Sequence, residues 1–167
     1  MSPAGGGPAA AALDLLRGLG LTLATAESLT GGLVGAALTA VPGSSDVYRG
    51  GLVCYATDLK ATLAEVPADL LAQHGPVAPE TAAALAAGAA RACGADVGVA
   101  TTGVAGPSPQ DGHPVGEVYV AVARGSEPPE VRALRLTGDR EAVRTLAVDA
   151  ALALLLEVVG TAAGPQH

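Results

Sequence analysis

The sequence TLATAESLTGGLVGAAL, residues 22–38, joins a strand-like pattern to a helix-like pattern. Residues 21–25 are a short apolar run typical of a buried strand, and residues 31–41 are an Ala- and Leu-rich run typical of a helix. Polar residues and two glycines separate the runs, which indicates a strand, a turn and a helix. Ser28 and Thr30 lie in that turn. The free N–H groups at the start of a helix can donate there to an anion or to a capping side chain.

Helices and strands alternate in the rest of the chain. We predict a helix that ends at Gly18 or Gly20 and a long Ala-rich helix from Pro79 to about Cys93. Strands are expected at 50–56, 116–124 and 130–136, and at the start of 96–106 before a glycine-rich loop. Shorter amphipathic or helical segments are expected at 58–66 and 67–75, and a closing helix at 138–159. This order predicts an α/β fold, a three-layer α/β/α sandwich with a mixed central sheet.

Length and composition predict one domain. The chain has 167 residues, of which 50% are hydrophobic and 15% charged, so it can bury a core of its own. We assign residues 9–159 to this domain. Residues 1–8 and 160–167 are rich in Gly, Pro and Ala, and they are expected to be disordered tails.

Charge and missing motifs exclude several classes of function. The net charge of −7 and the lack of a Lys/Arg cluster argue against direct binding of nucleic acid. No export signal or long uncharged apolar run is visible, so we expect a soluble cytoplasmic protein that does not bind a membrane. Cys54 and Cys93 are expected to be free thiols. The histidines are scattered too widely to suggest a metal site, and no Walker A, nucleophile-elbow or dinucleotide motif is found, so these standard sites are not expected.

Polar residues remain at the predicted strand ends and loop–helix junctions. Ligands of open α/β sheets lie outside the carboxyl ends of the strands, so these side chains are expected to converge on one crevice. Helix capping is the alternative for Ser28 and Thr30. A turn role is the alternative for Ser44 and Ser45, and a strand role for Thr102. The candidates are Ser28, Thr30, Ser44, Ser45, Tyr55, Lys60, Thr101, Thr102 and Gly103.

Lys60 is the only lysine in a chain that contains eight arginines. A guanidinium stays protonated, whereas a lysine amine can release its proton when its surroundings favour the neutral form. We therefore interpret Lys60 as a candidate for chemistry that arginine cannot perform, with a chance position on a helix face as the alternative.

Several segments together resemble the signature blocks of one family. They occur in that family's order and cover Leu13 to Val159. The blocks are TLATAESLTGG, VPGSSDVYRGGLVCYATDLKATL, QHGPVAPETA, TTGVAGP, PVGEVYVAVA and TGDREAVR. The sequence is thereby similar to the CinA C-terminal domain family, the nicotinamide-nucleotide amidohydrolases. Members are α/β/α domains, free-standing or fused behind a molybdopterin-binding-like domain. We expect this chain to lack the second domain.

The resemblance implies that the carboxamide of nicotinamide mononucleotide is hydrolysed to the carboxylate, with release of ammonia and without a cofactor. Ser28 matches the nucleophile, Lys60 the general base and Tyr55 a neighbouring tyrosine of the site. Thr102 and Arg140 match positions associated with substrate binding or catalysis. For a carboxamide, Lys60 would take the serine proton and later protonate ammonia, provided that its pKa is lowered by burial or by a neighbouring cation.

Further substrate contacts follow from the same interpretation. We expect the 5′-phosphate at the backbone N–H groups of Thr30, Gly31 and Gly32 and at the turn of Ser44 and Ser45, with Gly103 beside Thr102. Either Arg140 or Arg144 is expected to act as the neighbouring cation or to bind the phosphate.

Two departures from the family pattern affect substrate contacts rather than the catalytic groups. The segment ATDLK stands where many relatives have Asn and Glu before the lysine, and Leu29 stands where Cys is frequent. A homo-oligomer is expected. The alternatives are an amidase for another small amide, or a non-catalytic nucleotide-binding or interaction module of the competence or DNA-damage response.

Overall fold

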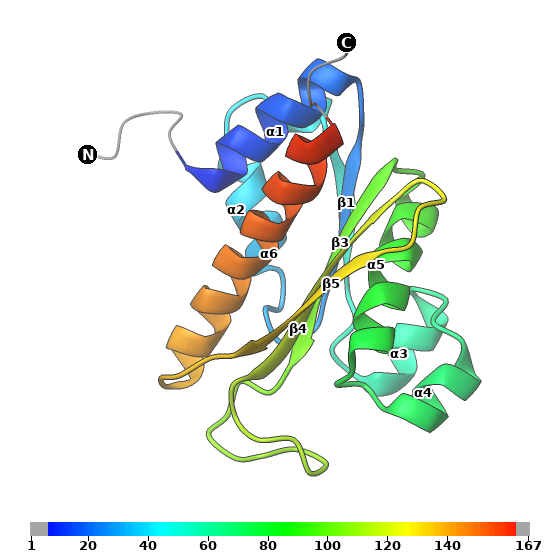
Figure 1. The fold of residues 1–167 in the computed structure, drawn as a ribbon, viewed down its shortest axis with the longest axis vertical. Coiled ribbons are helices and arrows are strands. Elements are labelled where there is room, and N and C mark those ends of the chain that lie inside the picture. Colours follow the sequence, from blue (N-terminus) through cyan, green and yellow to red (C-terminus); the bar gives the residue numbers. More distant parts are fainter. Residues whose placement is uncertain (1–6, 163–167) are drawn as a thin grey trace.

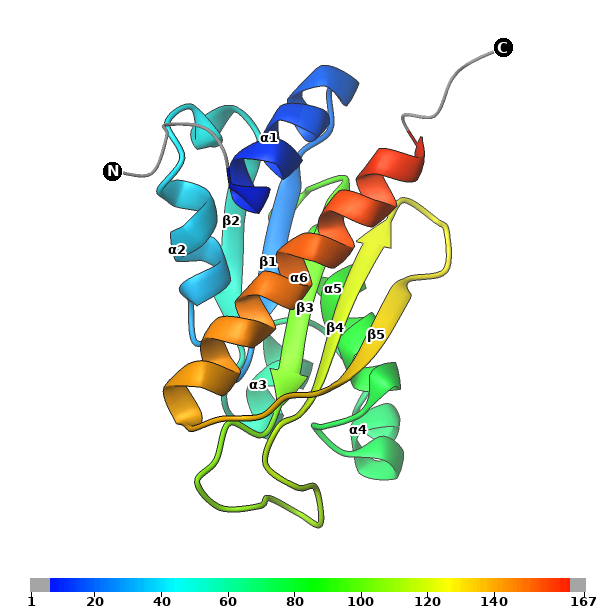
Figure 2. The ribbon, with the colours of Figure 1, turned by 60° about the vertical axis from the view of Figure 1, so that its left-hand side comes forward.

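A five-stranded mixed sheet lies between two layers of helices in the computed structural model, which describes residues 7–162 (Figure 1). The strand order is β2-β1-β3-β4-β5, as Figure 2 shows from the side of α6. Parallel pairs join β1 to β2 and β3, and antiparallel pairs join β3 to β4 and β4 to β5. The strands are β1 (Leu23–Glu27), β2 (Tyr48–Val53), β3 (Val97–Gly103), β4 (Glu117–Arg124) and β5 (Glu130–Arg135). The predicted α/β/α sandwich with a mixed sheet is confirmed.

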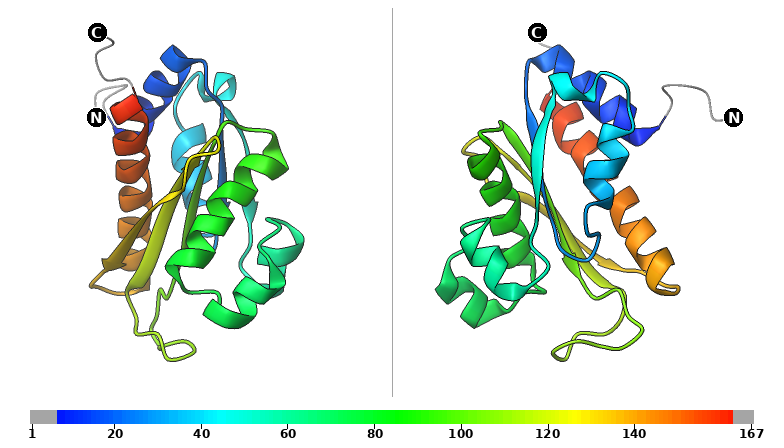
Figure 3. Two further views of the ribbon diagram at one scale, coloured as in Figure 1. Left: turned by 45° about the vertical axis from the view of Figure 1, so that its right-hand side comes forward. Right: turned by 180° about the vertical axis from the view of Figure 1, so that it is seen from behind.

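Helices cover both faces of the sheet, as the two views of Figure 3 show. One face carries α1 (Pro8–Leu19), α2 (Leu33–Thr39) and α6 (Arg140–Ala162). The other face carries α3 (Thr57–Thr62), α4 (Ala68–His74) and α5 (Pro79–Cys93). A short 3-10 helix, η1 (Ser44–Asp46), precedes β2.

The two faces of the sheet are packed with side chains of different size. Leu and Val dominate the core beneath α1, α2 and α6, whereas alanines dominate the core beneath α5. Small residues let α5 approach the sheet closely. A Cβ added at Gly98 of β3 would lie 1.9 Å from the carbonyl oxygen of Ala86 in α5, so only glycine fits there.

The observed elements differ from the predicted ones mainly at their ends. The first strand continues to Glu27 rather than ending at residue 25. Glu27 can be buried there because its carboxylate accepts hydrogen bonds from the N–H groups of Val34 and Gly35. At the two ends of the domain, α1 begins at Pro8 and α6 continues to Ala162, so both helices extend past the predicted limits of 9–159. The rest of the predicted tails, 1–6 and 163–167, lies outside the described residues. None of the described helices is both long and apolar enough to cross a bilayer.

The carboxyl ends of β1, β2 and β3 lie at one edge of the sheet because these strands are parallel. The turn of residues 28–32 follows β1, and the loop of residues 104–116 joins β3 to β4 at the same edge. The N-terminal end of α6 also lies there (Figure 2). This edge is where a ligand site is expected in an α/β sheet.

Candidate active site

A cavity of about 290 Å³ opens at the carboxyl edge of the sheet. Its walls come from the turn after β1, the start of α3, the segment before α5, the loop between β3 and β4, and the first residue of α6. The polar side chains among its lining residues are those of Ser28, Tyr55, Thr57, Lys60, Thr102, Ser108, Gln110 and Arg140. Sequence positions from 28 to 140 thus meet in one cavity.

Ser28 and Lys60 are in direct contact in this cavity. Lys60 Nζ donates to Ser28 Oγ over 3.0 Å, and it also donates to the carbonyl oxygens of Cys54 at 2.7 Å and Tyr55 at 3.4 Å. Lys60 is 1% exposed and Ser28 is 7% exposed. Ser28 itself is held at the end of β1, because its N–H donates to the carbonyl oxygen of Thr101 in β3 over 3.1 Å.

Burial shifts the protonation equilibrium of Lys60 toward the neutral amine. Burial lowers the pKa of Lys60, because the ammonium has left water for a site in which its neighbours are a hydroxyl and two carbonyls. Among the ion pairs found in residues 7–162, none involves Lys60. A buried lysine without a carboxylate partner can act as a proton acceptor.

Glu27 occupies the N-terminus of α2, where the sequence predicted a phosphate. Its Oε1 accepts from the N–H of Val34 at 2.8 Å and its Oε2 accepts from the N–H of Gly35 at 3.0 Å. Because this carboxylate already satisfies the helix end, the structure leaves no anion site there of the kind predicted. Glu27 was not among the residues predicted for the site, although an acidic residue a few positions before a helix start is a known stabilising pattern.

Thr30, Gly31 and Gly32 do not line the cavity. The hydroxyl of Thr30 is fully buried and donates to Glu27 Oε1 at 2.6 Å, and it is hydrogen-bonded to the hydroxyl of Thr101 at 2.8 Å. Gly31 and Gly32 have φ values of +56° and +105°, which glycine adopts without strain. The double glycine therefore serves the sharp turn into α2, and the predicted phosphate contact of these three residues is not supported.

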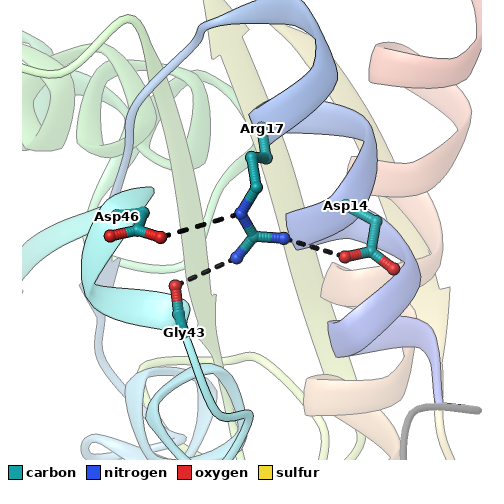
Figure 4. Close-up of polar contacts among 4 residues, drawn as sticks. All are labelled: Asp14, Arg17, Gly43 and Asp46. Atoms are coloured by element: carbon teal, nitrogen blue, oxygen red, sulfur yellow. Dashed lines mark hydrogen bonds and ion pairs between the residues drawn. The ribbon is translucent and has the colours of Figure 1, made fainter.

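Ser44 and Ser45 lie at the opposite edge of the sheet, which corrects their predicted place in the site. They belong to η1, which leads into the amino end of β2, whereas the cavity lies at the carboxyl ends of the parallel strands. Arg17 of α1 holds this turn by donating to the carbonyl oxygen of Gly43 at 2.9 Å, and it lies 3.9 Å from Asp46 (Figure 4). A turn that connects a helix to the start of a parallel strand must lie at that edge.

Tyr55 and Arg140 meet at the mouth of the cavity. Arg140 Nη2 donates to the hydroxyl of Tyr55 over 3.3 Å, and its Nη1 donates to the carbonyl oxygen of Gly106. Tyr55 is 62% exposed, and it approaches Lys60 through its carbonyl oxygen rather than its hydroxyl. Of the two arginines considered from the sequence, Arg140 lines the cavity and Arg144 does not.

Thr102 and Gly103 form part of the cavity wall at the end of β3. The hydroxyl of Thr102 donates to the carbonyl oxygen of Pro76 over 2.6 Å, which fixes the segment before α5 against the strand. The loop residues 104–110 also line the cavity, although they were not among the residues predicted for the site. Their position directly after Thr102 and Gly103, at the carboxyl end of β3, was the available signal.

Acidic, histidine and cysteine side chains do not gather in the described part of the chain. No group of three or more of them, within residues 7–162, is arranged to hold a metal ion. The cavity walls offer hydroxyls, carbonyls, the carboxamide of Gln110, one amine and one guanidinium.

Fold and site together define an α/β domain with a buried serine–lysine pair at the carboxyl edge of its sheet. The chain belongs to the family of the CinA C-terminal domain, whose family model matches residues 8–159. The resemblance read from the sequence blocks is thus confirmed.

Relatives and solved structures agree with this assignment. A CinA-like protein of Frankia casuarinae is 50% identical over 86% of this chain and 33% of its own length. The chain thus spans about a third of the length of the curated relatives it matches. A CinA superfamily protein from Klebsiella pneumoniae has a TM-score of 0.88 and 34% identity over 92% of this chain and 96% of its own. A competence/damage inducible protein from Agrobacterium tumefaciens has a TM-score of 0.85 and 34% identity over 95% of this chain and 99% of its own.

Proposed function

We propose that this protein is a metal-independent amidohydrolase that converts the carboxamide of nicotinamide mononucleotide to the carboxylate. The observation that supports the chemistry most directly is the 3.0 Å contact between Ser28 Oγ and Nζ of the buried Lys60. A serine becomes an effective nucleophile when a base of suitable pKa lies within hydrogen-bonding distance of its hydroxyl. Nicotinamide mononucleotide is the substrate implied by the resemblance of the sequence.

The reaction proceeds in two halves, acylation of Ser28 and hydrolysis of the acyl ester. Ser28 Oγ attacks the carboxamide carbon while its proton passes to Nζ of Lys60, and the carbonyl oxygen of the substrate becomes an oxyanion. Lys60 returns the proton to the departing nitrogen, so that ammonia leaves and an acyl ester of Ser28 remains. Water then attacks this ester with Lys60 as base, which releases the carboxylate and restores the serine.

The lowered pKa of Lys60 is consistent with both of its roles. A lysine with its ordinary pKa of about 10.4 is protonated at neutral pH and cannot accept the serine proton. Burial lowers the pKa of Lys60 and so increases the fraction of neutral amine. The same lowering makes the protonated amine a stronger acid, which favours transfer of its proton to the departing nitrogen so that ammonia forms.

Arg140 supports binding of an anionic substrate. Its guanidinium lies at the mouth of the cavity, beside the exposed Tyr55, and it is the one arginine among the lining residues. The 5′-phosphate is therefore assigned to Arg140, in place of the helix end that Glu27 occupies and the turn of Ser44 and Ser45.

The test is release of ammonia from nicotinamide mononucleotide by the purified protein. Ser28→Ala is expected to reduce kcat by at least about a thousandfold, because loss of a serine nucleophile costs more than this in other serine hydrolases. Ser45→Ala is the matched control, since Ser45 is exposed at the opposite edge of the sheet. A chelator is expected to leave the rate unchanged.

Each result bears on a different part of the proposal. Near-native ammonia release by Ser28→Ala would remove Ser28 as the nucleophile. Loss of activity with a chelator, restored by added zinc, would overturn the metal-independent mechanism. Hydrolysis of other small amides, with no reaction of nicotinamide mononucleotide, would overturn the assignment of nicotinamide mononucleotide as the substrate.

A further inference from the structure

Arg144 holds the turn that follows Ser28. From the second turn of α6, its Nε donates to the carbonyl oxygen of Leu29 over 2.9 Å. Its Nη2 lies 3.4 Å from the carbonyl oxygen of Thr30 and donates to it. One planar guanidinium thus binds two successive carbonyls, those of the first and second residues after the proposed nucleophile.

Gly31 leaves space for this guanidinium because it has no side chain. A Cβ added at Gly31 would lie 3.3 Å from Nη2 of Arg144, and the φ of +56° at this position disfavours residues with side chains. The glycine after Thr30 thus allows both the turn and the approach of Arg144. The hydrogen bond from Arg144 to Leu29 joins segments that are 115 residues apart in the sequence.

Arg144 fixes the direction of N–H groups through the peptide planes it binds. In a trans peptide, the C=O and N–H of one plane point in opposite directions. By holding the carbonyl of Thr30, Arg144 orients the N–H of Gly31, which donates to the carbonyl of Ser28 over 3.1 Å. The carbonyl of Ser28 in turn fixes the N–H of Leu29 on the opposite side of its own plane.

The N–H of Leu29 has the features of an oxyanion donor. Within residues 7–162, it donates no hydrogen bond, and Leu29 lines the cavity beside Ser28. The N–H of the residue after a nucleophilic serine is a recurrent oxyanion donor in acyl transfer. A fixed donor of this kind stabilises the charge that develops on the substrate oxygen.

We propose that Arg144 is a positioning residue that aligns the N–H of Leu29 with the oxyanion formed when Ser28 attacks. The inference rests on the proposed serine chemistry, although it does not depend on which amide is the substrate. A lysine at this position has one nitrogen and cannot bind both carbonyls in one plane.

The experiment compares Arg144→Met and Arg144→Lys with the native chain. Arg132→Met is the matched control, because Arg132 also fastens α6, through Glu157 near the other end of the helix. The first readout is kcat and KM for nicotinamide mononucleotide. Both Arg144 variants are expected to lose about tenfold to a hundredfold in kcat, the scale of a small misalignment of catalytic groups, with KM within about threefold. Arg132→Met is expected to retain native values.

The second readout is independent of the substrate. An alkyl fluorophosphonate phosphonylates an activated serine: Ser28 Oγ bonds to phosphorus, its proton passes to Lys60, and fluoride leaves. The phosphoryl oxygen then lies where the oxyanion forms. The rate of labelling, followed by intact mass, is expected to fall in the Arg144 variants by the same factor as kcat. Circular dichroism melting identifies any variant that does not fold. If one Arg144 variant does not fold, the labelling rate of the other one tests the positioning role of Arg144.

The outcomes separate the inference from the proposed function. Native labelling rates in a folded Arg144 variant overturn the inference, as does a rise in KM without a fall in kcat. A native chain that is labelled at Ser28 but releases no ammonia overturns the proposed function, and the labelling rates still decide the role of Arg144. A native chain that is not labelled at Ser28 overturns both.

Discussion

Replacing Lys60 by Met tests whether a buried amine is the base of this site. Methionine has nearly the same length and volume, so the packing around α3 is largely preserved. It removes the amine that contacts Ser28 Oγ at 3.0 Å and leaves the carbonyl oxygens of Cys54 and Tyr55 without that donor. We expect kcat for ammonia release to fall by at least about a hundredfold, the lower range for losing general acid–base catalysis.

The same substitution has a predicted signature in stability. Burial lowers the pKa of Lys60 in the native protein below the ordinary value of about 10.4 that the unfolded chain keeps. Between these two pKa values the unfolded chain binds a proton that the native protein does not, so the native protein gains stability as the pH rises. The slope reaches at most about 1.4 kcal/mol per pH unit for one proton. Below the lowered pKa both states are protonated, and this slope vanishes.

Denaturant unfolding between pH 7 and pH 10 measures this effect. The free energy of unfolding of the native chain minus that of Lys60→Met is expected to increase with pH. Because Cys54 lies beside Lys60 and burial raises the pKa of its thiol, both proteins are compared in a Cys54→Ala background. The value at one pH is not decisive, since unpaired carbonyls cost about 1–3 kcal/mol while the loss of a buried ammonium is stabilising. Parallel pH profiles, or a variant that retains most of its kcat, would refute the assignment of Lys60 as the base.

Two further substitutions test the frame around the site. Glu27→Gln is expected to lower the free energy of unfolding by about 1–3 kcal/mol. The carboxylate accepts three hydrogen bonds, from the N–H groups of Val34 and Gly35 and from the Thr30 hydroxyl, and an amide cannot accept all three. A change below about 0.5 kcal/mol would contradict this role. Gly98→Ala is expected to destabilise the domain by about 1–3 kcal/mol through overpacking against α5, measured by the same unfolding experiment, and a native stability would show that α5 moves away without cost.

Local patterns were enough to predict most elements. The helix at Pro79–Cys93 has the predicted limits, because proline at its start and glycine after its end are signals that act within one turn. The strands of the second half lie within about a residue of their predicted limits, as their alternation predicts. The first strand was predicted too short, because the partners that satisfy Glu27 are hydrogen-bond donors in the next helix that no local pattern reveals.

By itself, the sequence determined the order of helices and strands, the mixed sheet and the family, because these follow from short-range periodicity and from blocks in a fixed order. It also singled out Ser28 and Lys60, although only the tertiary structure joins them, across 32 residues of sequence. The tertiary structure alone decided that Ser44 and Ser45 lie away from the cavity, that Arg140 lines it, and that Arg144 binds the turn after Ser28. These are contacts between distant segments. Their geometry depends on how the whole sheet brings its loops together, which spacing along one chain does not specify.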